Sequence, residues 1–374
     1  MSRNRYDWSK LSSDLVRTIF EGLATKDYHR ARTVCSNWYS ISTTCKRPLY
    51  PWRILLNKNS ILLYDPKEDK IQETEHPGID FSIVSVMASC SNWLLIVDTR
   101  LNFYLLNVFT RETIVLPSME SSLLGARFER KDEWEHFIER TDIISSKKAA
   151  VLWINERTRD YVVAWSYKRH FLFSYKNGDD SWLKLEGTDC IDLAYKGDKL
   201  YVLASDVRKL CIKIFDLSLK EVEQGNPYCN LDTRAVLKHG EPMWKSSVAI
   251  TNSGEVLIIV SLRGLGQKCL LYVYKMNLES GNWERVDSLG GEMLIFGHGV
   301  TIRAPVKEID GGGIKSDSIG FLGCDLWPAP AYFHSDNVPV KCGVFDLATS
   351  TITWPEVPVG VSYFKSFWFV PGYA

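Results

Sequence analysis

The chain has 374 residues, and its 45 basic and 45 acidic side chains give a formal net charge of zero at pH 7. This balance, without any basic block, gives no electrostatic basis for binding nucleic acid. The hydrophobic share of 45% excludes a disordered chain, and no apolar run approaches the roughly 20 residues of a membrane-spanning helix. We therefore expect a globular protein that binds neither nucleic acid nor membrane.

The nine cysteines are scattered and odd in number, and no two of them form a CxxC pair. The first residues, MSRNRYDWSK, are polar and do not resemble a secretory leader. Both features indicate a reducing compartment, where thiols serve as small apolar side chains. We expect the protein in the cytosol, the nucleus or both. The sequence does not choose between them, because it contains no strong basic cluster that would favour import into the nucleus.

The first element expected along the chain is helical and lies within residues 5–45. Its apolar side chains recur every four residues, which is the spacing of one helix face: they are Leu11, Leu15, Ile19 and Leu23. Ser12 or Ser13 can cap this helix. A second stretch from Asp27 places Val34 and Trp38 at a similar spacing. Two or three short helices are predicted.

From residue 46 to residue 374 the pattern changes to short runs of alternating or continuous apolar residues between polar turns. Such runs predict strands of an all-β sandwich, barrel or propeller; examples are residues 61–64, 93–97, 161–165, 256–260 and 270–274. Many of the aromatic residues lie in these runs, where a pleated surface accommodates them. The chain is thus predicted to be mainly β, with a helical N-terminus.

One hairpin pattern occurs six times, with an aromatic-ended strand, a polar turn and a second apolar strand. Its turn positions are separated by 44, 67, 39, 61 and 69 residues; they are Pro66, Thr110, Asn177, Asp216, Asn277 and Asp346. A propeller blade takes roughly 40 to 50 residues, so the longer gaps indicate insertions. A repeated hairpin favours a propeller of about six blades, with seven as the alternative.

The tail at residues 361–370 alternates apolar and polar side chains and reads as a closing strand. Propellers commonly close by pairing the last strand with the first blade, because this removes an exposed edge. We expect the tail to pair near Ile54 to Tyr64.

The sequence lacks the common catalytic and metal-binding motifs. It contains no HExxH, GxSxG or P-loop, and its seven histidines include no pair at the helical spacing of metal ligands. His298 lies between Gly297 and Gly299 and is interpreted as a loop or core histidine. No cofactor, metal ion or catalytic residue is predicted, and an enzyme remains the alternative that a perturbed cluster at the propeller channel would support.

The helical segment resembles an F-box. The resemblance rests on the run from Trp8 to Leu23, on Asp27, and on the ending Arg32-Thr-Val-Cys-Ser-Asn-Trp38. Ser12 stands where the family usually has proline. The missing proline weakens the preset start of the helix but leaves its apolar surface.

F-box segments bind a Skp-type adaptor, which connects them to a cullin RING ubiquitin ligase. The resemblance implies that six side chains supply this contact or hold the helices that do: Leu11, Leu15, Ile19, Leu23, Val34 and Trp38. The alternative from the residues alone is that Leu15, Ile19 and Trp38 pack on the β domain, because a unit of about forty residues seldom buries enough apolar surface by itself.

The remainder resembles the plant F-box family with domain of unknown function 295, the KIB-type β-propeller. The resemblance is carried by residues 192–201, 251–257, 273–278, 283–290, 317–321 and 343–347. Members usually have Ile-Tyr-Phe where this chain has Ile319-Gly-Phe321, a change expected to weaken one strand.

Together these resemblances imply a non-catalytic substrate receptor of a ubiquitin ligase, which holds an unidentified protein target. The alternative is a scaffold outside the ligase, with an F-box that has decayed at Ser12. Exposed loop aromatics are good anchors for a partner, and we select Trp134, Trp327 and Tyr332 as candidate substrate contacts. Packing between blades is the alternative for these and for most other tryptophans.

Overall fold

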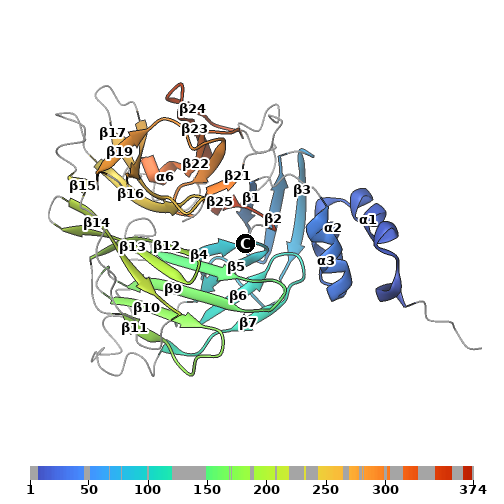
Figure 1. Ribbon diagram of the computed structural model, residues 1–374. Coiled ribbons are helices and arrows are strands. Elements are labelled where there is room, and N and C mark those ends of the chain that lie inside the picture. The colour runs from blue at the N-terminus through green and yellow to red at the C-terminus, as the bar shows by residue number, and fades with distance from the viewer. Residues whose placement is uncertain are drawn as a thin grey trace, which may run out of the picture.

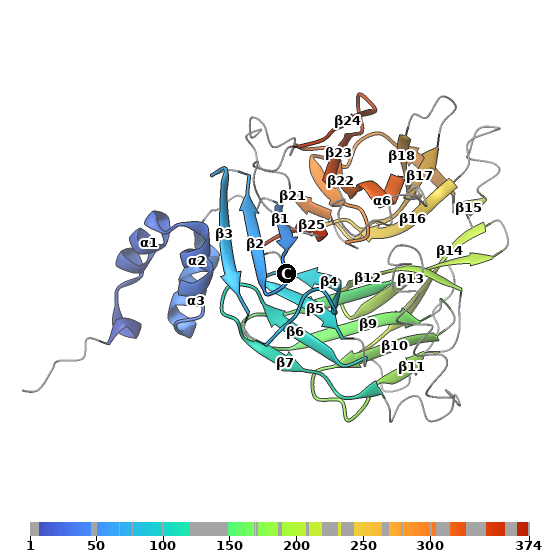
Figure 2. The same ribbon diagram turned by 180° about the vertical axis from the view of Figure 1, so that it is seen from behind.

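The computed structural model describes the helical segment and most of the β domain. The described residues are 7–45, 51–66, 68–76, 78–98, 101–119, 149–167, 169, 171–185, 189–206, 209–218, 231–232, 243–263, 269–277, 280, 282–298, 301–303, 315–326, 342–355 and 365–372. A small helical unit lies beside a ring of sheets (Figures 1 and 2).

The helical unit has a 3-10 turn and three short helices, as the apolar spacing predicts. Its elements are η1 (Trp8–Lys10), α1 (Ser13–Gly22), α2 (Thr25–Ala31) and α3 (Ser36–Thr44). Val16 and Phe20 are four residues apart on α1, so both face α2 and α3, and both are fully buried. The helices therefore share a small core of their own.

Six sheets form the ring and are numbered here as blades I to VI. Blade I consists of β25 (Lys365–Phe369), β1 (Trp52–Leu56), β2 (Ser60–Asp65) and β3 (Lys70–Glu75). Blade II consists of β4 (Ser85–Cys90), β5 (Trp93–Val97), β6 (Phe103–Asn107) and β7 (Thr113–Val115). Blade III consists of β8 (Ala150–Ile154), β9 (Tyr161–Tyr167), β10 (Phe171–Lys176) and β11 (Leu183–Leu185).

Blades IV to VI complete the ring. Blade IV consists of β12 (Cys190–Lys196), β13 (Lys199–Asp206), β14 (Lys209–Asp216) and β15 (Leu231–Asp232). Blade V consists of β16 (Met243–Ile250), β17 (Val256–Arg263), β18 (Cys269–Met276) and β19 (Trp283–Val286). Blade VI consists, in spatial order, of β21 (Thr301–Arg303), β20 (Glu292–Ile295), β22 (Ser318–Leu322), β23 (Cys342–Asp346) and β24 (Thr351–Thr353). A short helix, α6 (Gly323–Leu326), follows β22. The fold is a six-bladed β-propeller, which confirms the predicted class and settles the blade number.

Each hairpin pattern in the sequence belongs to a different blade. In five blades the pattern spans the last two strands, and in blade IV it begins on β14. The gaps between patterns are unequal because connections of different length separate the strands, both between blades and within a blade such as VI, where residues 304–317 and 323–341 lie between strands. The longest connection within the described sheets runs from β7 to β8, between residues 115 and 150.

The ring closes through the tail of the chain. β25 pairs antiparallel with β1, and Phe367 lies opposite Ile54 in the register, within the region expected for the tail. Blade VI departs from the simple pattern, because β20 lies between β21 and β22 and runs parallel to β22.

The apolar core of the ring lies between neighbouring blades. Among the described residues, six buried clusters each join two adjacent blades around the whole ring. The predicted packing role of Trp93, Trp165, Trp182 and Trp283 is confirmed, since all four are buried in these clusters. Closure therefore buries apolar area at every interface, and this burial is the main stabilising term of such a fold.

Candidate protein-interaction site

The helical unit is organised around the ring of Phe20. Tyr28 and Trp38 approach it edge-on, with ring centroids 5.1 Å and 5.7 Å from that of Phe20. The Trp38 indole N–H donates to the carbonyl of Trp8 at 3.0 Å, and the Tyr28 hydroxyl donates to the carbonyl of Ser42 at 2.8 Å. These bonds satisfy the polar ends of two buried aromatics and join α3 to η1 and to α2.

The six predicted adaptor residues fall into three groups by exposure. Leu15 and Val34 are each 56% exposed, and Leu11, Ile19 and Leu23 are half-buried beside the core of the unit. Trp38 is only 8% exposed, so it holds the helices and offers little surface to a partner. Leu15 on α1 and Val34 between α2 and α3 thus present apolar side chains that the described part of the chain leaves mostly uncovered.

This exposure bears on the alternative interpretation, in which these side chains pack on the propeller. Trp38 is buried, but within the helical unit, and Leu15 points to solvent. The contact with the propeller instead uses α2, which the sequence pattern did not single out.

The contact between α2 and blades II and III is called here the joint, and comprises His29, Arg30, Arg32, Phe109 and Glu156. The His29 ring stacks on Phe109 with centroids 4.9 Å apart and planes within 3°. The Arg32 guanidinium pairs with the Glu156 carboxylate at 3.5 Å, and both side chains are about 10% exposed. Arg30 Nε donates to the Phe109 carbonyl at 3.2 Å. The joint is therefore both apolar and ionic.

The joint identifies the face of the propeller that carries the helices. Glu156 follows β8 and accepts a hydrogen bond of 2.6 Å from Ser91, which follows β4. Gly372, after β25, lies beside His29, since a Cβ placed there would come within 2.7 Å of the imidazole. The ends of three inner strands thus meet the helical unit, while the starts of these strands lie at the opposite face.

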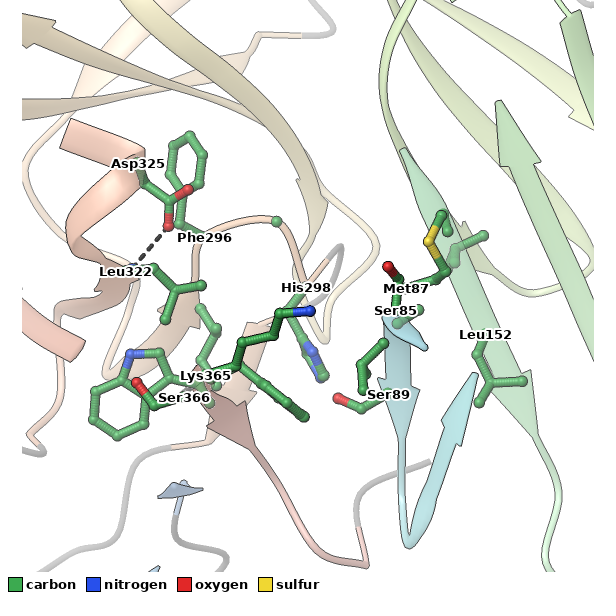
Figure 3. Close-up of a pocket in the computed structure, with 18 of the residues that line it drawn as sticks. Ser85, Met87, Ser89, Leu152, Phe296, His298, Leu322, Asp325, Lys365 and Ser366 are labelled. Atoms are coloured by element: carbon green, nitrogen blue, oxygen red, sulfur yellow. Dashed lines mark hydrogen bonds between the residues drawn. The ribbon is translucent and has the colours of Figure 1, made fainter. Parts of the chain in front are cut away.

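Inside the ring, the starts of the inner strands surround a cavity of about 350 Å³. Figure 3 shows side chains from β4 and β8 on one wall and His298, Lys365 and Asp325 on the other. Lys245 pairs with Asp325 at 3.1 Å. Burial raises the pKa of Asp325 and the Lys245 ammonium opposes this rise, whereas burial lowers the pKa of His298 to about 4.

A second buried carboxylate lies next to the cavity and has a structural role. Asp192 on β12 accepts hydrogen bonds from the Ser247 hydroxyl, at 2.5 Å, and from the amide of Val248, at 3.0 Å. Ser247 Oγ in turn accepts from the amide of Gly297 at 3.1 Å. Burial raises the pKa of Asp192 to about 6. Ser247 is 1% exposed, so this chain connects blades IV, V and VI and offers no accessible nucleophile.

The predicted substrate contacts Trp134, Trp327 and Tyr332 lie outside the described residues. Trp134 belongs to the connection between β7 and β8, and the other two follow α6. Within the described residues, no three metal-ligating side chains are grouped to hold an ion. No helix in the described part of the chain is both long and apolar enough to cross a membrane.

Comparison with known proteins identifies both parts of the chain. Residues 8–50 match the F-box domain, and residues 63–346 match the KIB1-4 beta-propeller. The Arabidopsis thaliana protein At2g33200, named as an F-box protein, is 65% identical over the full length of both chains. F-box only protein 7 of Arabidopsis thaliana is 44% identical, across 100% of this chain and 96% of its own.

A further relative is the F-box/kelch-repeat protein KIB1 of Arabidopsis thaliana, which is 38% identical over 80% of this chain and 75% of its own. Among solved structures, the N-terminal domain of Nup159 is 11% identical, with a TM-score of 0.35 over 81% of this chain and 72% of that one. That likeness is too weak to bear on function. The matches along the sequence, by contrast, cover nearly all of the chain, and the chain belongs to the family of plant F-box proteins that carry a KIB1-4 β-propeller.

Proposed function

We propose that the protein is the substrate-recognition subunit of an SCF-type ubiquitin ligase. In this role the F-box binds a Skp-type adaptor, and through it a cullin RING ligase. The propeller binds a target protein and holds it near the ligase for ubiquitin transfer. The chain itself contributes proximity and no chemistry, so it is not an enzyme and needs no cofactor.

The observation that carries this proposal is the uncovered apolar face of the F-box. Leu15 and Val34 are more than half exposed although the unit has its own core and is fixed to the propeller by other residues. Burying a leucine-sized side chain contributes roughly 1.5–3 kcal/mol, and a few such anchors sustain a firm helical interface. Nothing in the fold of the described residues requires these side chains to be exposed, and a partner helix would cover them.

The arrangement of the two faces supports the same role. The joint occupies the face where the inner strands end, so the opposite face and its connections are left for a target. An adaptor on α1 and a target on the far face would not compete for surface. We propose that the protein works in the cytosol, the nucleus or both, because SCF-type ligases act on proteins there.

The test is recovery of a Skp-type adaptor by the full chain, compared with the double variant Leu15→Asp plus Ile19→Asp. Two carboxylates in the apolar face would remove most of the free energy that is gained when an adaptor buries this face. We therefore expect adaptor recovery to fall at least tenfold. Val115→Asp is the matched control, because Val115 is 66% exposed on the outer strand of blade II.

Equal recovery by the double variant and the wild type would contradict the proposal. Failure of the wild-type chain to recover any adaptor, with a folded propeller that still retains other proteins, would favour the alternative of a scaffold with a decayed F-box.

A further inference from the structure

The central cavity of about 350 Å³ lies among the starts of the inner strands, away from the joint. Small-molecule sites are typically concave, mostly apolar and provided with a few convergent polar groups, with volumes from roughly 300 Å³ upward. Met87, Leu152 and Phe296 belong to the apolar part of this lining. The polar part decides which class of molecule fits.

The charged side chains of the described lining are already engaged. Lys245 Nζ lies 3.1 Å from the Asp325 carboxylate, which also accepts a hydrogen bond of 2.8 Å from the amide of Leu322. Lys365 has an interaction of its own and is not a free cation. A charged ligand would therefore leave water without a free partner for its charge, which is strongly unfavourable in a mostly apolar cavity. The lining favours an uncharged molecule.

The imidazole of His298 is the first neutral group that points to a ligand. It follows β20 and projects into the space between the two walls (Figure 3). Among the described residues its ring has no hydrogen-bond partner. Burial lowers the pKa of His298 to about 4, so at pH 7 the ring is neutral and can donate one hydrogen bond and accept another. An amide offers the complementary acceptor and donor.

Two hydroxyls on the facing wall have the same character. Figure 3 shows Ser85, Met87 and Ser89 of β4 on the wall across the cavity from His298. Neither hydroxyl has a side-chain hydrogen-bond partner in the described part of the chain. A serine hydroxyl can both donate and accept without carrying a charge. The two walls therefore present neutral groups that each suit a donor or an acceptor.

The backbone of this wall adds further neutral groups. β4 and β8 are edge strands of their sheets, and no strand of the described sheets pairs with their free sides. An edge strand leaves a row of N–H and C=O groups unpaired. Residues 85–89 and 150–152 line the cavity consecutively, which places these two edges on its wall. Such edges bind amide groups by the hydrogen bonds that another strand would make.

We propose that the cavity binds an uncharged amide on an apolar body, about the size of one capped amino-acid residue. The amide bonds to His298 and to the hydroxyls or the free edge of β4, and the body packs against the apolar part of the lining. Carboxylic acids and amines fit less well, because no charged side chain of the described lining is free to pair with them. This inference does not depend on the proposed ligase role.

The test uses the full chain, with N-acetyl-L-phenylalanine amide as the neutral probe. N-acetyl-L-phenylalanine, an anion at pH 7, and 2-phenylethylamine, a cation, present the same ring with a charge. Saturation-transfer NMR titration at pH 7 is expected to show saturable binding of the neutral probe. Each charged control should bind at least tenfold more weakly, because its charge loses water without gaining a partner.

The variant His298→Phe keeps a ring at this position and removes both ring nitrogens. It should weaken binding of the neutral probe at least fivefold, because an amide group of the probe is left unpaired. His76→Phe is the matched control. His76 is also a buried histidine, 3% exposed, but it lies outside the cavity, with its ring 6.0 Å from that of Phe81. Its replacement should leave binding unchanged.

A second variant keeps the test decisive if His298→Phe does not fold. Ser85→Ala plus Ser89→Ala removes both hydroxyls without adding volume, and should weaken the neutral probe at least threefold. Absence of saturable binding, charged controls that bind as tightly as the neutral probe, or binding that survives the folded cavity variants would overturn the proposal. Adaptor recovery measured on the same samples reports the F-box separately, so either proposal can fail without the other.

Discussion

At the scale of the residue, Ser12 tests how much the F-box depends on its usual proline. In the structure Ser12 is the N-cap of α1, with φ −62° and ψ 149°, and its side chain makes no capping bond. This φ is the value that a proline ring imposes, and the extended Leu11 before it (φ −61°, ψ 144°) suits a residue that precedes proline. The helix begins correctly without the ring, so the substitution has not removed the geometry.

The expected outcome is that Ser12→Pro stabilises the protein. A proline that adopts the native φ without strain reduces the freedom of the unfolded chain by about 0.4–1 kcal/mol. Equilibrium denaturation monitored in the helical unit checks this increase in the free energy of unfolding. Adaptor recovery should be at least equal to that of the wild type, and a decrease in either quantity would show that Ser12 has a role of its own.

At the scale of the element, the glycine of β22 is explained by the closing strand. A Cβ on Gly320 would lie 3.3 Å from the indole of Trp368 on β25, and this indole also donates to the carbonyl of Phe321 at 3.1 Å. The tryptophan thus occupies the space above the glycine and bonds to the same strand. The cost of glycine in a strand is offset locally, which the sequence by itself could not indicate.

A double-mutant cycle tests this exchange of volume between the two strands. Gly320→Tyr alone should destabilise the propeller by about 1–3 kcal/mol, because the ring has no room beside Trp368. Trp368→Ala alone should cost about 3–5 kcal/mol through the cavity it leaves. Combined, the changes should cost clearly less than their sum, and simple additivity in urea denaturation would contradict the contact.

At the scale of the whole molecule, the joint fixes the F-box to the propeller at a defined angle. Arg32 is part of the F-box motif, yet here its guanidinium reaches Glu156 on blade III and lies 5.1 Å from the ring of Tyr39. Because the ion pair is nearly buried, removing one partner leaves an uncompensated charge, at a cost of roughly 3–5 kcal/mol. We expect this fixed angle to set where a target lies relative to the ligase.

The variant His29→Ala plus Arg32→Ala should release the F-box from the propeller. Small-angle X-ray scattering is expected to show a larger maximum dimension, since the two parts no longer pack, while each part stays folded. Arg157→Ala is the control, because Arg157 is exposed and lies next to Glu156 in the same turn. A scattering profile equal to that of the wild type would mean that these contacts do not hold the angle.

The features that could be predicted from the sequence depend on local interactions. The α1 stripe follows from the periodicity of one helix, and each of the six hairpin patterns needs only a turn and two adjacent strands. In blade II, for example, the Asn107 side chain accepts from the amides of Phe109 and Thr110 at 3.0 Å. Such bonds form within a few residues, so the turn is already encoded in the local sequence.

The sequence by itself therefore determined the helical N-terminus, the strand-rich remainder, the repeated hairpin and the resemblance to the family. Tertiary structure alone decided the number of blades, the parallel pairing of β20 with β22, the joint between α2 and Glu156, and the grouping of His298 with Lys365. Each of these unites residues far apart in the chain, since Arg32 and Glu156 are 124 positions apart and His298 and Lys365 are 67 positions apart. No periodicity records such contacts, because they form only when ring closure brings distant strands together.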